Sequence, residues 1–160
     1  MSSEINLALV GASGVVGKKI ISLLEKKNVK VKNFYPLGSS SVGEKISLND
    51  QIFEIESLSN FDCASVDIAI FSAGSSVARD YAPDFVKKGV YVVDLSSEFR
   101  YEEDIPLIIP EINPQALIDA DGPILIANPN CSVSQLLIAI EPIHRKFNID
   151  ILNIATYQAV

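Results

Sequence analysis

The sequence predicts an α/β protein with a Rossmann-like, doubly wound and mostly parallel sheet. Three observations lead to this prediction. Short apolar runs alternate with helix-like segments, the runs stop at glycine or serine, and the first run is followed by Gly11, Gly14 and Gly17. With 160 residues, 48% of them hydrophobic and 21% charged, the chain has the composition of a globular domain with one good core.

The N-terminal segment predicts a strand, a glycine turn and a helix in direct succession. Its first apolar run ends at a glycine, as a buried parallel strand does, and Gly17, Ile21 and Leu24 fall on one helical face behind the turn. This order opens a βαβ unit. The elements expected here are a strand at 5–10, a helix at 18–27, a strand at 29–37 and a hairpin of 45–48 with 51–55.

The strand and helix pattern repeats through the rest of the chain. Serines precede the next helical stripe, and serine is a favourable N-cap residue. The elements expected in this part are strands at 66–71, 90–94 and 124–127, helices at 77–87, at 113–120 and from Cys131 onward, and a last strand at 149–160. That last strand stops without a cap, a turn or a polar tail, so we expect it to belong to a region that is cut, not finished.

Charge, hydropathy and cysteine content argue against several function classes. The net charge of −7 disfavours nucleic acid or an anionic membrane as the main partner, and no apolar run approaches the roughly 20 residues of a membrane span. The N-terminus lacks the basic region of a signal peptide, so we expect a cytoplasmic protein. Two cysteines, Cys63 and Cys131, and the single His144 predict neither a disulfide framework nor a metal site.

The glycine turn is the candidate cofactor site. Its three glycines stand between a predicted strand and a predicted helix. Dinucleotide-binding domains use glycine there for the tight turn, for close approach of the pyrophosphate and for helix packing. The spacing differs from the commoner G-x-G-x-x-G, and a glycine-rich turn without a ligand is the alternative. The context favours a dinucleotide.

A serine loop, residues 38–43, follows the second predicted strand, where NAD-binding units carry an acidic residue for the ribose. Without a carboxylate, nothing repels a 2′-phosphate, and Ser39, Ser40 and Ser41 together with Lys45 could bind one. We therefore expect NADP as the cofactor, with NAD possible. A flexible serine loop without a ligand is the alternative.

Cys131 is the candidate nucleophile. It lies in Asn128-Pro129-Asn130-Cys131-Ser132, between an apolar run and a helix-like run. The amides and the dipole at a helix N-terminus favour an anion, so a thiol in such a position tends toward the thiolate. The alternative is a small buried hydrophobic residue.

Arg100 follows the strand predicted at 90–94, at the sheet edge where open α/β folds bind ligands. Its guanidinium could hold a phosphate or a carboxylate through two hydrogen bonds, and a solvated loop arginine is the alternative. We expect Cys63 to be structural and His144 to lie at the surface.

Five motifs, in one order and spacing, resemble the aspartate-semialdehyde dehydrogenase family. They are Gly11-Ala-Ser-Gly-Val-Val-Gly17, Phe71-Ser-Ala-Gly74, Pro110-Glu-Ile-Asn113, Asn128-Pro-Asn-Cys-Ser132 and Thr156-Tyr-Gln-Ala-Val160. The resemblance covers the whole chain. It implies NADPH-dependent reductive dephosphorylation of L-aspartyl-4-phosphate to L-aspartate 4-semialdehyde, in the route to lysine, methionine and threonine.

The resemblance also implies residue roles. Cys131 would form a thioester with the acyl group, Asn130 would line the acyl site and Gln158 would orient the substrate, while Arg100 would bind phosphate. The residues implied to hold the cofactor are Gly11, Ala12, Ser13, Gly14, Val15, Val16 and Gly17 in the turn, Ser39, Ser40 and Ser41 in the serine loop, and Ser72, Ala73 and Gly74 after the strand at 66–71.

The same resemblance divides the chain into two parts. Residues 1–129 would be an NADP-binding Rossmann-like domain, and residues 130–160 the truncated start of an α+β catalytic and dimerisation domain. Small-molecule substrates and a homodimer or higher homo-oligomer are implied for the full-length protein. A chain that stops there is expected to be inactive alone.

Two departures keep alternatives open. The family usually has an arginine where this shorter loop has Ser41, and an asparagine where this chain has Leu95. The run at 94–100 and the start of the glycine turn are closer to N-acetyl-γ-glutamyl-phosphate reductase, which performs the same chemistry. That reductase is one alternative, and a non-catalytic nucleotide-binding or interaction module is the other.

Overall fold

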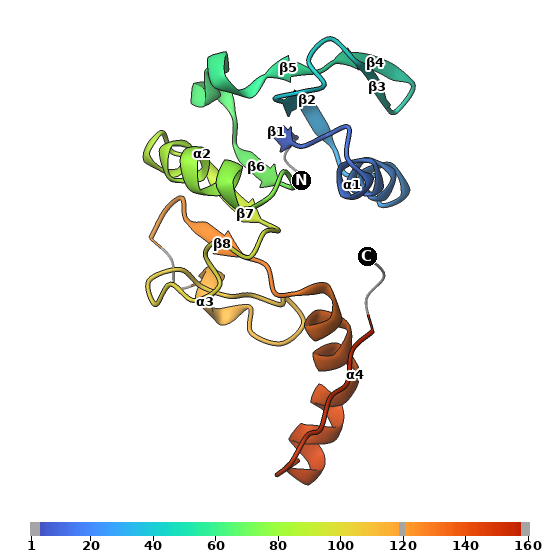
Figure 1. Cartoon of the computed structure of the whole chain (residues 1–160), viewed down its shortest axis with the longest axis vertical. Helices are drawn as coiled ribbons and strands as arrows, with labels where there is room; N and C mark the ends of the chain where they lie inside the picture. Colours follow the sequence, from blue (N-terminus) through green and yellow to red (C-terminus); the bar gives the residue numbers. More distant parts are fainter. Residues whose placement is uncertain (1–3, 119–120, 158–160) are drawn as a thin grey trace.

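The strand β1 (Ile5–Val10) lies in the middle of a six-stranded parallel sheet (Figure 1). The computed structural model describes residues 4–118 and 121–157. The strand order is β5-β2-β1-β6-β7-β8, which is the 3-2-1-4-5-6 order of a doubly wound sheet when these strands are numbered along the chain. The predicted Rossmann-like fold is confirmed. The other strands of the sheet are β2 (Val31–Gly38), β5 (Glu56–Ser57), β6 (Ile68–Phe71), β7 (Tyr91–Asp94) and β8 (Leu125–Ala127).

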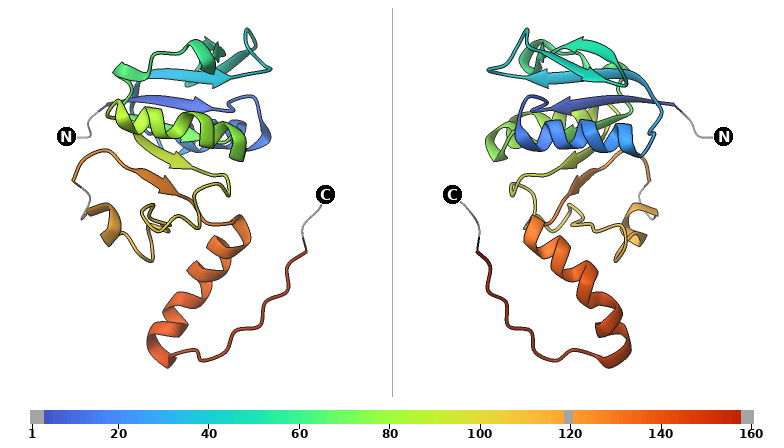
Figure 2. Two further views of the ribbon diagram at one scale, coloured as in Figure 1. Left: turned by 60° about the vertical axis from the view of Figure 1, so that its left-hand side comes forward. Right: turned by 90° about the vertical axis from the view of Figure 1, so that its right-hand side faces the viewer.

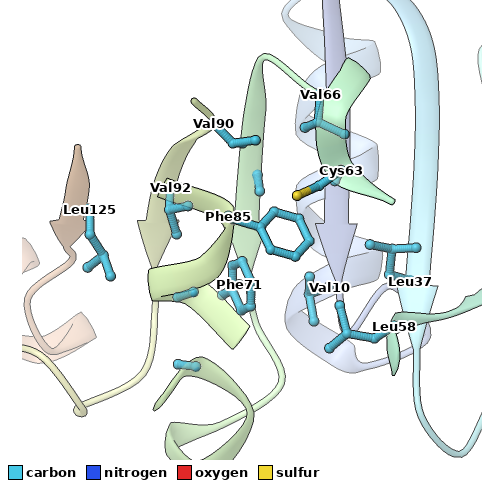
Figure 3. Close-up of a cluster of buried hydrophobic side chains, with 14 of the residues drawn as sticks. Val10, Leu37, Leu58, Cys63, Val66, Phe71, Phe85, Val90, Val92 and Leu125 are labelled. Carbon is cyan, nitrogen blue, oxygen red and sulfur yellow. The ribbon is translucent and has the colours of Figure 1, made fainter. Parts of the chain in front are cut away.

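Both faces of the sheet are covered by packed side chains. Successive side chains of β1 point to opposite faces, and those on each face are buried. Leu7 and Leu9 join one buried cluster, while Ala8 and Val10 join another. The second cluster is shown in Figure 3, where the rings of Phe71 and Phe85 lie among aliphatic side chains. Their centroids are 5.3 Å apart, in an edge-to-face contact. The apolar runs of the sequence therefore form a sheet buried on both sides.

One long helix covers each face (Figure 2). α1 (Val15–Lys26) packs Ile21 into the cluster of Leu7 and Leu9. α2 (Ser75–Lys87) packs Ala78, Ala82 and Phe85 into the opposite cluster. The helix prediction is confirmed in both cases, although α1 begins at Val15, so Gly17 lies inside the helix.

A hairpin stands where a crossover helix would join β2 to β5. It consists of β3 (Lys45–Leu48) and β4 (Gln51–Glu54), which pair antiparallel as predicted. Asn49 and Asp50 have φ angles of 50° and 64°. A type I′ turn requires positive φ at both central residues, and Asn and Asp tolerate it well. Two short 3-10 helices, η1 (Leu58–Asn60) and η2 (Cys63–Ser65), then lead into β6.

The carboxyl ends of the parallel strands meet at one edge of the sheet (Figure 2). At this edge each loop is hydrogen bonded to the end of a neighbouring strand. The four bonds run from Gly11 N to Leu37 O (2.8 Å), from Ser72 N to Val10 O (2.9 Å), from Leu95 N to Phe71 O (3.0 Å) and from Asn128 N to Asp94 O (2.9 Å). The serine loop, the glycine turn and the loops after β6, β7 and β8 therefore stand in a fixed order along the edge.

The long helix α4 (Cys131–Phe147) begins at this edge and projects away from the sheet (Figure 1). The helix predicted from Cys131 is confirmed. Large apolar side chains remain exposed on it, including Ile143 and Phe147 at 51% and 70%. After α4 the chain turns back and diverges from the helix as it leaves it (Figure 2).

Two local predictions differ from the structure, whereas the short helix lies where it was predicted. Residues 149–157 form no strand, because the described part of the chain offers them no strand to pair with; residues 158–160 lie outside the described residues. The short helix is α3 (Gln115–Ile118), within the range predicted. Gly74, and no serine side chain, caps the start of α2, since its φ of 90° suits glycine. No helix among the described residues is long and apolar enough to cross a membrane.

Candidate active site

The glycine turn has no room for side chains at two of its positions. Gly11 has a φ of 82°, and a Cβ atom there would lie 2.8 Å from the carbonyl oxygen of Ser72. A Cβ atom at Gly17 would lie 2.3 Å from the carbonyl oxygen of Gly11. The two glycines let the turn approach β6 and let α1 approach the turn, as a dinucleotide cradle requires.

The first turn of α1 faces the carboxyl edge with its amides. Gly14 caps the helix without a side-chain hydrogen bond, and the amides of the first turn have no intrahelical acceptors. Val15 and Val16 are exposed at 89% and 51%, so their backbone is accessible. Amides and the helix dipole together favour an anionic group at this point.

A hollow of about 290 Å³ joins the glycine turn to the serine loop and to the loop after β6. Eight of the predicted cofactor residues line it: Gly11, Ser13, Gly14, Ser39, Ser40, Ser41, Ser72 and Ala73. The sequence did not single out its remaining lining residues, which are Val10, Gly38, Leu58 and Val77. Their contribution depends on the packing of β1, β2, η1 and α2 against one another, for which a single sequence gives no direct signal.

The other predicted cofactor residues lie around the hollow without lining it. Ala12 is fully buried in the cluster on the α1 side, and Gly17 is buried where the helix passes the turn. Val15 and Val16 stand exposed at the start of α1, and Gly74 caps α2. Their backbone, and not their side chains, is what the geometry can offer to a ligand.

Hydroxyl groups fix the walls of the hollow. The Ser13 hydroxyl donates to Ser41 Oγ at 2.8 Å, and the Ser72 hydroxyl donates to the carbonyl of Val10, also at 2.8 Å. A pyrophosphate at the helix start with a ribose toward the serine loop matches this distribution of amides and hydroxyls. The residues present therefore fit a dinucleotide.

Lys45 does not belong to this hollow. It lines a separate depression between α1 and the hairpin, together with Lys18 and Glu25. The suggestion that Lys45 helps to bind a 2′-phosphate is not supported, because Lys45 lines the depression beside α1 and does not line the hollow.

Cys131 is the first residue of α4 and is exposed. Asn130 caps the helix: its Oδ1 accepts from the amide of Ser132 at 3.0 Å and from the Ser132 hydroxyl at 2.7 Å. The Cys131 sulfur lies 3.7 Å from the same oxygen. The cap fixes the start of α4 and with it the position of the thiol at the carboxyl edge.

Arg100 joins the loop after β7 to the loop that leads to Cys131. Its Nε donates to the carbonyl of Asn128 at 2.9 Å, and one terminal nitrogen donates to the carbonyl of Leu95 at 3.3 Å. A guanidinium has five N–H donors, so further donors remain for an anion. Arg100 is thus tied to both loops, next to the residues that precede the thiol.

A network that the sequence did not reveal shapes the loop after β7, residues 95–100, which we call the Arg100 loop. The fully buried carboxylate of Asp94 accepts from the amide and the hydroxyl of Ser96, and Ser96 Oγ accepts from the amide of Glu98. Arg79 of α2 holds the Glu98 carboxylate through two hydrogen bonds, one of them 2.8 Å long. The hydrogen bond from Arg79 lowers the pKa of Glu98, and the pair raises the pKa of Arg79.

The remaining predicted residues lie outside this arrangement. Cys63 is buried in the cluster of Figure 3, and burial raises the pKa of its thiol. His144 is exposed on α4, where Nδ1 accepts from the amide of Ile149. Gln158 lies outside the described residues. Within residues 4–118 and 121–157, no three His, Cys, Asp or Glu side chains gather as a metal site would require.

The chain has close relatives among known proteins. A family model described as "Semialdehyde dehydrogenase, NAD binding domain" matches residues 6–120. Over its whole length the chain is 45% identical to aspartate-semialdehyde dehydrogenases of Shewanella violacea and Legionella pneumophila, of which it covers 48% and 46%. The chain therefore spans about half the length of the curated relatives that it matches.

Solved structures give the same picture of the fold. Aspartate semialdehyde dehydrogenase II of Vibrio cholerae, complexed with ASA, is similar with a TM-score of 0.85 and 38% identity, over 89% of this chain and 47% of that one. The Candida albicans aspartate semialdehyde dehydrogenase with NADP is similar with a TM-score of 0.71 and 24% identity, over 92% and 48%. At that lower identity the likeness concerns the fold alone.

Proposed function

The chain belongs to the semialdehyde dehydrogenase family and contains its NAD-binding domain, and from this premise we propose that its protein is an aspartate-semialdehyde dehydrogenase. The proposed reaction is the NADPH-dependent reductive dephosphorylation of L-aspartyl-4-phosphate to L-aspartate 4-semialdehyde, a step toward lysine, methionine and threonine. One observation carries the proposal: Cys131 starts α4 at the same sheet edge as the dinucleotide cradle.

We further propose a division of labour along the chain. Residues 1–129 would bind the cofactor, and residues 130–160 would begin a catalytic and dimerisation domain. The contrast between the two parts supports this assignment. The sheet region has two buried clusters, whereas no residue of α4 is buried.

The proposed chemistry begins at the thiol. The sulfur of Cys131, as the thiolate, forms a bond to the acyl carbon of aspartyl phosphate, the bond from that carbon to the phosphate oxygen breaks, and inorganic phosphate leaves with the electron pair. A thioester on Cys131 remains. Asn130, whose side chain already fixes the first turn of α4, would line the acyl site, and Gln158 would orient the substrate.

Arg100 is proposed to stabilise the leaving phosphate. Two hydrogen bonds hold the guanidinium against the backbone of Leu95 and Asn128, so that it is positioned before substrate arrives. A preorganised cation needs little rearrangement when negative charge develops on the leaving oxygen.

The chemistry supplied by a bound nicotinamide dinucleotide is hydride transfer, which reduces the acyl group to the aldehyde. The residues proposed to hold it are those of the glycine turn, the serine loop and the segment 72–74. NADP is the proposed form, with NAD also possible, because none of the described residues that line the hollow carries a carboxylate that would repel a 2′-phosphate.

Alkylation of the 160-residue chain by iodoacetamide, followed by peptide mass spectrometry, tests the proposal. Cys131 should react well before Cys63, which is buried and has a raised pKa. Inorganic phosphate should slow the reaction of Cys131. Reaction of Cys131 no faster than that of Cys63, or reaction unaffected by phosphate, would favour a non-catalytic nucleotide-binding module.

A matched pair of variants separates the phosphate site from general charge. Arg100→Gln should remove the protection of Cys131 by phosphate. Arg145→Gln removes the same charge on α4, where Arg145 pairs with Glu141, and should leave the protection unchanged.

A further inference from the structure

The end of β2 is the place where a dinucleotide-binding domain reads the adenosine ribose. Here the position is occupied by Gly38, which is buried beside the glycine turn: Gly11 donates its amide to the carbonyl of Leu37. A Cβ atom on Gly38 would lie 2.7 Å from Ser41 Oγ and 3.1 Å from Ile55 Cγ2. An acidic side chain, which would select a ribose 2′-hydroxyl and reject a 2′-phosphate, is absent here, and one could enter only if the hydroxyl of Ser41 turned away.

The groups that do face a ligand here are hydroxyls. Ser41 is only 8% exposed, and its oxygen accepts a hydrogen bond from Ser13. Because Ser13 is the donor of that bond, the hydroxyl of Ser41 keeps its own proton for donation. Ser39 and Ser40 are exposed and line the same hollow. A serine hydroxyl can donate to a phosphate oxygen and can equally accept from a ribose hydroxyl.

Charged side chains are missing from the lining of this hollow among the residues that the structure describes. Lys45, the basic residue that follows the loop in sequence, lines the depression near α1 instead. An arginine or lysine would favour a 2′-phosphate through charge-assisted hydrogen bonds, and a carboxylate would oppose it through repulsion. The hollow offers neither effect.

We infer that the site accepts NADP and NAD with little discrimination, and that Ser39, Ser40 and Ser41 set this property by presenting hydroxyls alone. The inference rests on the proposed dinucleotide site and deepens it. A neutral hydrogen bond changes affinity by roughly two- to tenfold, which is the scale of preference that hydroxyls can produce.

Fluorescence titration of the 160-residue chain with NADPH and with NADH measures the preference directly. The two dissociation constants should agree within about tenfold. A ratio above about tenfold in either direction overturns the inference and leaves the proposed function standing. Binding of neither dinucleotide overturns both, so the two failures are distinguishable.

Charge variants of the loop test whether these serines set the preference. Ser40→Arg should shift the ratio of dissociation constants toward NADPH by at least about tenfold, through pairing with the 2′-phosphate. Ser39→Asp should shift it toward NADH by a similar factor, through repulsion. If both variants are folded by circular dichroism and neither shifts the ratio, the assignment of specificity to this loop is wrong.

Matched controls add the same charges elsewhere. Ser22 is exposed on α1 and does not line the hollow. Ser22→Arg and Ser22→Asp should leave the ratio unchanged. An equal shift in these controls would show an effect of net charge and would also overturn the inference.

Discussion

Single residues determine whether the glycine turn can form. A Cβ atom on Gly11 would lie 2.8 Å from a backbone oxygen, and one on Gly17 would lie 2.3 Å from another. Both distances are too short for a carbon atom, so any other residue would force the backbone to shift. The spacing of the glycines predicted the turn, since the need for glycine at a tight βα turn is local. The backbone contact between Gly11 and Ser72 could not be predicted in this way, because Ser72 lies in the loop after β6, far along the chain.

The substitution Gly17→Ala should destabilise the protein by about 1–3 kcal/mol, because the new methyl group overlaps the carbonyl of Gly11. Urea unfolding followed by circular dichroism measures the change. Lys19→Ala, an exposed substitution in the same helix, should change stability by less than about 0.5 kcal/mol. Equal stability of Gly17→Ala and the unmodified chain would show that the turn can relax.

The hydrogen-bond partners of the Arg100 loop could not be predicted from the sequence. Arg79 and Glu98 are 19 positions apart, and Arg100 and Asn128 are 28 apart. Nothing in the local pattern pairs them, because their meeting depends on the order of β6, β7 and β8 in the sheet. The sequence identified Arg100 as a candidate anion site but not the two carbonyls that hold it.

The Arg79 and Glu98 pair predicts a pH dependence of stability. The folded-state pKa of Glu98 is lowered by the hydrogen bond from Arg79, so its contribution is present above the ordinary glutamate pKa, about 4.3, and is lost as the pH falls through the lowered value. Glu98→Gln should therefore lower the melting temperature near pH 7, and the difference from the unmodified chain should shrink below pH 4. Glu102→Gln, in the same loop, is the charge-matched control. A melting difference that persists unchanged at low pH would contradict the linkage.

At the scale of elements, α4 carries the candidate nucleophile and depends on its cap. Asn130 supplies one oxygen to the amide and the hydroxyl of Ser132. The start of this helix was predictable, since an Asn before Cys-Ser and an apolar stripe is a local signal. The strand predicted after it was not correct, because a strand needs a partner, and the described part of the chain provides none.

Removal of the cap should loosen the start of α4. Asn130→Ala should cost about 1 kcal/mol of local stability, so the amide of Ser132 should exchange with solvent roughly fivefold faster by NMR. Asn130→Asp, an equally good cap, should restore slow exchange. If the alanine variant exchanges as slowly as the unmodified chain, the cap does not fix the helix start.

At the scale of the whole molecule, the sheet order and its two buried clusters place five loops along one edge. The alternation of apolar runs with helical stripes predicted the fold class, because both periodicities are local. The order of loops along the edge follows from the doubly wound topology. The sequence predicted the two loops that border the hollow, the glycine turn and the serine loop. It did not predict that Leu58 and Val77 line the hollow, since tertiary packing brings them there.

The central claim is that Cys131 is the acyl-accepting thiol of a dinucleotide-dependent reductase. Its most direct test is the steady-state formation of NADPH from NADP, aspartate semialdehyde and phosphate. The protein to assay joins residues 1–160 to the part of the Shewanella violacea relative that the chain does not match. NADPH should form with Cys63→Ser and should fall by at least about a thousandfold with Cys131→Ser. Equal rates for the two variants, with NADPH binding intact in both, would contradict the account.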